Sequence, residues 1–103
     1  MPTGNNLEHE VITALGALQN LLKEPKESVN HEELARQCDI VARECSKGLS
    51  ERVLATEKKG YDILINCART FEEIIVRAAA VRALASLMDG NPDPLEEEGF
   101  KVP

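Results

Sequence analysis

Apolar residues recur every three or four positions along most of this chain, which is the spacing of one face of an α-helix. The pattern predicts long helices over residues 7–24, 31–47 and 71–89, with short helices over residues 51–59 and 61–69. No stretch alternates apolar and polar residues in the manner of a half-buried strand. The expected fold class is therefore all-α, with five helices.

Residues that start or stop helices punctuate this pattern. Gly48 and Gly90 are expected to end long helices. At Gly48 we expect a left-handed backbone conformation, which glycine adopts at little cost. Pro25 is expected to end the first helix, since the residue before a proline avoids helical geometry. The polar residues expected to cap helices are Asn6, Asn30 with Glu33, Ser50, and Thr70 with Glu73.

The stretches that end at Gly48 and Gly90 match one another at an offset of 42 residues. Apolar residues pair with apolar residues at this offset, as Leu34 does with Val76. All-helical repeats of about this length are typical of α-solenoids. Such proteins present an extended surface to other macromolecules and seldom carry out chemistry.

Two segments carry a family resemblance. The run Ser-Glu-Arg-Val-Leu-Ala-Thr-Glu-Lys-Lys-Gly-Tyr at 50–61 is similar to the first helix of an armadillo repeat and the glycine that follows it. The run Ala-Leu-Ala-Ser-Leu-Met-Asp-Gly at 83–90, followed by Asn-Pro-Asp-Pro-Leu, resembles the end of a third helix. The chain thus resembles the armadillo repeat family over roughly residues 30–100.

The resemblance implies a fragment of a right-handed α-solenoid with about two repeats. Residues 1–6 would be a flexible lead-in, residues 7–90 the helical repeats, and residues 91–103 the start of an incomplete further repeat or a tail. Third helices of the family line a concave groove that binds extended peptides. The residues expected in a protein-binding groove here are Glu33, Gln37, Ile40, Glu44, Ala79, Arg82 and Ser86.

The family's peptide-binding members often place a Trp and, four residues later, an Asn in this groove. The matching pairs in this chain are Arg82 with Ser86 and, one repeat earlier, Ile40 with Glu44. Neither repeat keeps the family's pair. We therefore do not expect recognition of nuclear localisation peptides, and we expect a different protein partner.

The net charge of −6 arises from 18 acidic and 12 basic residues. Nucleic acid is a poor partner for such a chain, because its recognition relies on clustered Lys and Arg. A basic protein or peptide is more compatible. No segment has the length and hydropathy of a leader or a membrane span, and three cysteines fit reduced thiols, so a cytosolic or nuclear protein is expected.

No constellation of residues predicts catalysis, a cofactor or a metal. Cys38 and Cys45 lie two helical turns, or roughly 10 Å, apart, which is too far for a disulfide. No Cys-x-x-Cys pair is present to anchor zinc. His9 and His31 stand near helix starts among acidic residues, where surface roles are common. We expect no enzyme, no cofactor and no metal.

Three functional interpretations remain at this level. The first is a non-catalytic interaction module that binds a peptide or helix on the third-helix face. The second is an N-terminal cap of a longer solenoid without a binding role of its own. The third is an independent helical bundle. A truncated solenoid also leaves an apolar end uncovered, so self-association through the C-terminal end is expected.

Overall fold

The computed structural model describes residues 9–89, which form five helices and no strand. The helices are α2 (Glu10–Leu22), α3 (His31–Cys45), α4 (Leu49–Glu57), α5 (Gly60–Thr70) and α6 (Ile74–Asp89). This order of two long, two short and one long helix confirms the all-α class and the succession expected from the sequence. The expected Asn6 cap and Gly90 stop lie outside the described residues.

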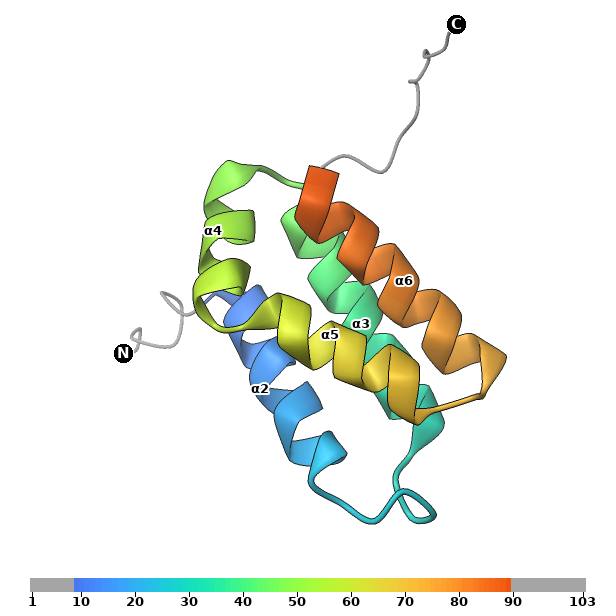
Figure 1. Cartoon of the computed structure of the whole chain (residues 1–103). Coiled ribbons are helices and arrows are strands. Elements are labelled where there is room, and N and C mark those ends of the chain that lie inside the picture. The colour runs from blue at the N-terminus through green and yellow to red at the C-terminus, as the bar shows by residue number, and fades with distance from the viewer. Residues whose placement is uncertain (1–8, 90–103) are drawn as a thin grey trace, which may run out of the picture.

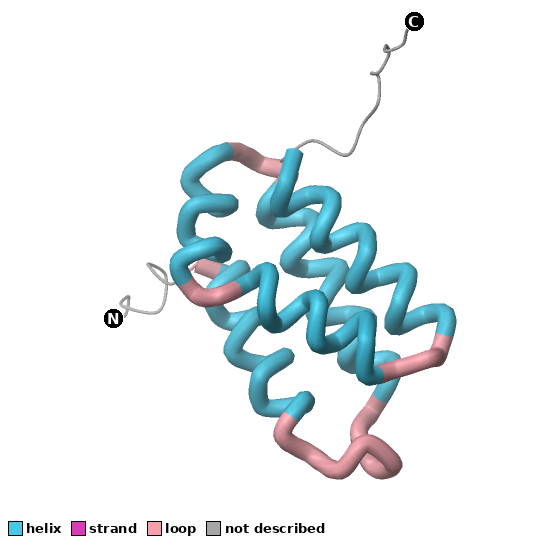
Figure 2. The backbone as a smooth tube through the Cα atoms, viewed as in Figure 1, coloured by secondary structure: helices cyan, strands magenta, loops and turns pink. Residues whose placement is uncertain are grey.

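The helices form two antiparallel hairpins, α2 with α3 and α5 with α6, as Figures 1 and 2 show. The two hairpins meet along α3 and α6, which pack against each other more extensively than any other pair. Helix α4 lies across one end, in contact with the four other helices. The chain therefore builds two similar units and places their last helices side by side.

Contacts between α3 and α6 follow the sequence repeat. Asp39 accepts a hydrogen bond of 2.9 Å from Nη2 of Arg82, 43 residues later. The hydroxyls of Ser46 and Ser86, 40 residues apart, lie 3.4 Å from each other. The contact later in α3 is also the contact later in α6, so the two helices run in the same direction. Residues about 42 apart in the sequence therefore lie side by side in the structure.

All five helices contribute to one hydrophobic core. Its largest buried side chains, each at most 2% exposed, are those of Phe71, Leu15, Leu18, Leu34 and Leu64. Cys38, Cys45 and Cys67 are also fully buried, as free thiols. The helices are thus held mainly by apolar burial, as short helices require.

One expected cap is confirmed in part. The side chain of Asn30 accepts a hydrogen bond of 3.1 Å from the backbone N–H of Glu33, at the start of α3. The carboxylate of Glu33 does not return to Asn30, because it accepts hydrogen bonds from Arg36 and Gln37 instead. The capping box is therefore half formed.

Other boundary predictions are wrong. Gly48 has φ 162° and ψ −178°, an extended backbone, and it precedes α4 directly. Ser50 consequently lies inside α4 and is not its cap. Thr70 is the last residue of α5, where its hydroxyl donates to Asn66, so it does not open the next helix. The left-handed residue is Lys59, with φ 64°, in the turn between α4 and α5.

Candidate functional site

The seven predicted groove residues lie on α3 and α6, but few of them are accessible. Gln37 and Glu44 of α3 and Ala79 and Ser86 of α6 are buried. Glu33 and Ile40 are partly buried, and Arg82 is exposed. Arg82 is therefore the predicted groove residue with the most accessible side chain.

The acidic residues of α3 are satisfied within their own helix. Glu33 accepts hydrogen bonds of 2.7 Å from both Arg36 and Gln37, and these bonds lower its pKa, that from Arg36 most. Burial alone would raise the pKa of Glu44, but hydrogen bonds from Lys47 and Arg43 outweigh it and hold the pKa low. Neither carboxylate is left unpaired for a basic ligand.

A shallow depression of about 310 Å³ lies between the C-terminal halves of α3 and α6. Its lining residues are Ala42, Arg43, Ser46, Arg82, Ala85 and Ser86. Arg82 and Ser86 belong to the predicted groove, while the other predicted residues do not line this depression. Each arginine at its edge is already ion-paired, Arg82 with Asp39 and Arg43 with Glu10.

The outward face of α6 carries an apolar stripe that sequence reasoning missed. Its members are spaced four and three residues apart, and so share one face of the helix: Ile74, Ala78, Val81, Ala85 and Met88. Ile74 is 82%, Val81 57% and Met88 62% exposed. Side chains of this size and exposure in a row on one helix mark an interaction surface more often than a chance arrangement.

The first hairpin provides an internal comparison for this stripe. The residues 42 positions earlier, on the equivalent face of α3, are all polar and exposed: Glu32, Arg36, Asp39, Arg43 and Ser46. Helix α6 meets this face of α3 at Asp39 and Ser46, which lie within hydrogen-bond distance of Arg82 and Ser86, and all five residues stay exposed. Packing of a further helix beside this face therefore does not require an apolar stripe.

Exposed apolar side chains are distributed unevenly between the two hairpins. In residues 9–89 the large exposed ones are Leu49, Val53, Ile65, Ile74, Ile75, Val81 and Met88. All of them lie on α4, α5 or α6. The α2–α3 hairpin thus presents a polar surface, and the second half of the described chain presents the apolar one.

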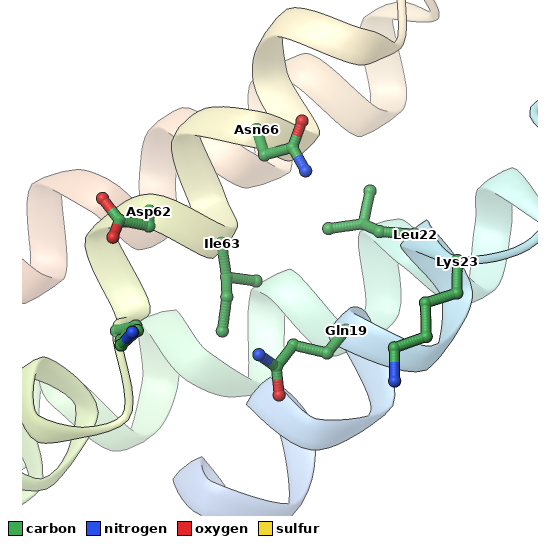
Figure 3. Close-up of a pocket in the computed structure, with 7 residues that line it drawn as sticks. Gln19, Leu22, Lys23, Asp62, Ile63 and Asn66 are labelled. Carbon is green, nitrogen blue, oxygen red and sulfur yellow. The ribbon is translucent and has the colours of Figure 1, made fainter.

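Two further depressions are less suited to a specific ligand. Figure 3 shows one of about 300 Å³ between α2 and α5, where the charged ends of Asp62 and Lys23 lie far apart on opposite sides. Leu22 and Ile63 contribute its apolar lining. The other, of about 600 Å³, lies along α4 and includes His9, Leu49 and Val53. Lys59 also lines the first and Glu57 the second, and both are open hollows in the surface rather than enclosed pockets.

The described residues offer little to acid–base or metal chemistry. Residues 9–89 contain no group of three or more His, Cys, Asp or Glu side chains placed to hold a metal ion. His9 contacts Glu51 at 3.2 Å, and His31 lies 3.7 Å from Glu73 while meeting the ring of Phe71 edge-on. Both histidines join the first hairpin to the second half of the chain, which is a structural arrangement.

Two of the buried thiols interact. A hydrogen bond between Cys38 of α3 and Cys67 of α5 raises the pKa of Cys38, and burial acts in the same direction. Cys45 has no such thiol partner, and burial raises its pKa to about 11, with Glu51 adding to the effect. The hydrogen bond with Cys38 lowers the pKa of Cys67. Cys38 and Cys45 therefore stay protonated at neutral pH and act as small apolar core residues.

The Cys45 thiol predicts a pH dependence of stability. Its folded-state pKa lies above the unfolded value of 9.0. The protonated thiol therefore contributes fully to the free energy of unfolding below pH 9, and this contribution is lost as the pH rises towards 11. Between pH 8 and pH 11 we expect the wild type to lose about 2 kcal/mol more unfolding free energy than Cys45→Ala. Denaturant titrations at both pH values measure this, and equal losses in the two proteins would contradict it.

Comparison of the chain with protein-family models, with curated proteins and with solved structures finds no match. No helix within residues 9–89 is long and apolar enough to cross a bilayer. The class that the fold defines is an all-α protein of two stacked helical hairpins. Its most distinctive surface is the apolar stripe on α6.

Proposed function

We propose that this chain is an armadillo-like α-solenoid segment that acts as a non-catalytic protein–protein interaction module in the cytosol or nucleus. It binds a peptide or helix on its third-helix face, formed by α3 and α6. The parallel packing of these helices, with partners 40 to 43 residues apart, supports the repeat architecture. The armadillo resemblance of residues 50–61 and 83–95 supports the same assignment.

The observation that carries the proposal is the apolar stripe on α6. Its three large side chains are more than half exposed, whereas the equivalent face of α3 is charged. Burying apolar area contributes roughly 25 cal/mol per Å², so covering these side chains favours association. A helix or extended peptide with an apolar face of its own is the partner that fits.

The charge of the stripe's surroundings refines the expected partner. Half of the net charge of −6 that suggested a basic partner lies after Asp89, where Asp93 and Glu96 to Glu98 outnumber Lys101. The stripe itself is uncharged, and Arg82 beside it is paired with Asp39. Affinity would therefore come mainly from apolar contact, and charge would act at the edge.

Partner capture from a cytosolic extract with point variants tests this function. Val81→Glu places a carboxylate at the middle of the stripe, and we expect it to reduce the retained partner at least ~10-fold, because burying the charge costs free energy. Ile65→Glu is the matched control, since it changes an aliphatic side chain of 41% exposure on α5. It should leave capture within ~2-fold of wild type, as changes outside an interface do.

A second candidate function is an N-terminal cap of a longer solenoid. The observation that favours it is the polar surface of the α2–α3 hairpin beside the apolar surface of α4 to α6. Terminal repeats carry such a polar outer face for solubility. Equal partner capture by wild type and Val81→Glu would favour this second function over the first.

A further inference from the structure

We propose that the partner on the α6 stripe is the α6 stripe of a second copy of this chain, packed antiparallel to the first. This inference rests on the proposed function only in taking the stripe as a docking surface. It adds the identity of one occupant, a two-fold symmetric dimer, and the register of the two helices.

The polarity of the other surfaces favours this occupant. If the stripe of one copy docked on the open face of α3 in another copy, it would cover the exposed side chains of Glu32, Arg36 and Arg43. Covering those charges with apolar side chains would cost desolvation free energy without compensation. The apolar face of α6 in a second copy carries no such charge along its centre, so a two-fold contact between identical patches fits best.

The order of large and small residues along the stripe is self-complementary. Ile, Ala, Val, Ala and Met follow one another from residue 74 to residue 88. In one antiparallel register, Ile74 lies opposite Ala85 of the second copy. In the same register Ala78 lies opposite Val81 of the second copy. Every large side chain in the central part then meets a small one, which allows close packing of the two helices.

The flanks of the stripe agree with this register. Ile75, which is 50% exposed, comes beside the aliphatic stem of Arg82 from the second copy. Leu84 comes beside the stem of Arg77 from the second copy, so no two like charges are opposed. The antiparallel direction also sets the positive end of each helix dipole against the negative end of the other.

The size of the stripe sets the strength of the dimer. From Ile74 to Met88 the helix rises about 21 Å, and one helix pair of that length buries less than the ~800 Å² per partner of a standard interface. The dimer should therefore be weak and dependent on concentration. Sedimentation equilibrium of the purified chain is the suitable measurement.

We expect a monomer–dimer equilibrium for the wild type and for Ile65→Glu, and a dissociation constant raised at least ~10-fold in Val81→Glu. Val81 is 57% exposed, so this change leaves the core intact. A wild type that remains monomeric at all accessible concentrations would overturn the dimer. Equal weakening by Val81→Glu and Ile65→Glu would also overturn it.

Cysteine cross-linking tests the register independently of affinity. In the antiparallel register, Ile74→Cys/Ala85→Cys should form an intermolecular disulfide under mild oxidation by diamide, which takes up the two hydrogen atoms of the thiols. Ile74→Cys alone should not, because its two copies would lie about 16 Å apart along the helices. Cross-linking of Ile74→Cys alone, or none with the double variant, would overturn the register.

The experiments distinguish failure of the dimer from failure of the proposed interaction function. A monomeric chain whose partner capture still depends on Val81 excludes the second copy and retains the interaction module. A dimer that depends on Val81, with no other protein captured, supports the second copy and removes the foreign peptide or helix.

Discussion

Replacement of Phe71 by Ala should lower the free energy of unfolding by about 3–5 kcal/mol, a large part of the stability of a domain this size. Phe71 is 2% exposed and is the largest fully buried side chain in residues 9–89. It stands between α5 and α6, where its ring meets that of His31 edge-on at 5.4 Å. Truncation removes core contacts from both hairpins and leaves a cavity. Urea denaturation followed by circular dichroism measures the loss.

His31→Ala is the matched control for Phe71→Ala. His31 is partly exposed and loses only the edge-on ring contact and a 3.7 Å approach to Glu73. We expect a loss of about 0.5–1.5 kcal/mol, the contribution of one aromatic pair. Comparable losses in the two variants would show that the buried Phe71 ring does not join the hairpins as described.

Gly60→Ala should cost about 1–3 kcal/mol, the usual effect of crowding a packed site. A Cβ atom at residue 60 would lie 2.8 Å from the backbone oxygen of Ala55 and 3.2 Å from Cδ2 of Leu87. The first contact is with backbone, so α4 and α5 would have to separate. Thermal unfolding should therefore occur at a lower temperature than in the wild type.

Gly16→Ala is the opposite case and serves as its control. Gly16 lies within α2, and nothing stands within 4 Å of a Cβ atom added there. Alanine favours the helix over glycine by about 1 kcal/mol, so this variant should be more stable than wild type. Effects of the same sign in both variants would contradict the close approach of α4 and α5 at Gly60.

The helices could be predicted because their burial follows their periodicity. Val11, Leu15 and Leu18 recur at helical spacing in α2, and all three are buried. The helix cap at Asn30 could also be predicted, because its side chain accepts a hydrogen bond from a backbone N–H only three residues later. The hairpin arrangement was less accessible, because it depends on contacts between residues about 40 apart, such as Asp39 with Arg82.

The boundary errors have local causes. The pattern predicts that Gly48 ends a helix. Helix α3 already ends at Cys45, the chain turns at Ser46 and Lys47, and Gly48 is the residue just before α4. Thr70 reads as a cap because Glu73 follows at the right spacing. Its hydroxyl bonds to Asn66 instead, one turn earlier in α5. A short polar side chain can serve either helix, and tertiary packing decides between them.

The site could not be located from periodicity alone. Helix α6 is apolar on nearly every side, so the sequence does not show which side faces the core. The predicted residues Ala79 and Ser86 lie on the buried side, and Val81 lies on the open one. Comparison of α6 with α3 at the 42-residue offset was the available signal, because it sets Val81 against Asp39.

The central claim is that the apolar stripe of α6 is where a partner binds, and methyl NMR of the chain titrated with a captured partner tests it most directly. The account predicts that the methyl signals of Ile74, Val81 and Met88 shift on binding, while those of Val53 and Ile65 stay in place. Unchanged signals from the three stripe residues, with shifts at Val53 or Ile65, would contradict it.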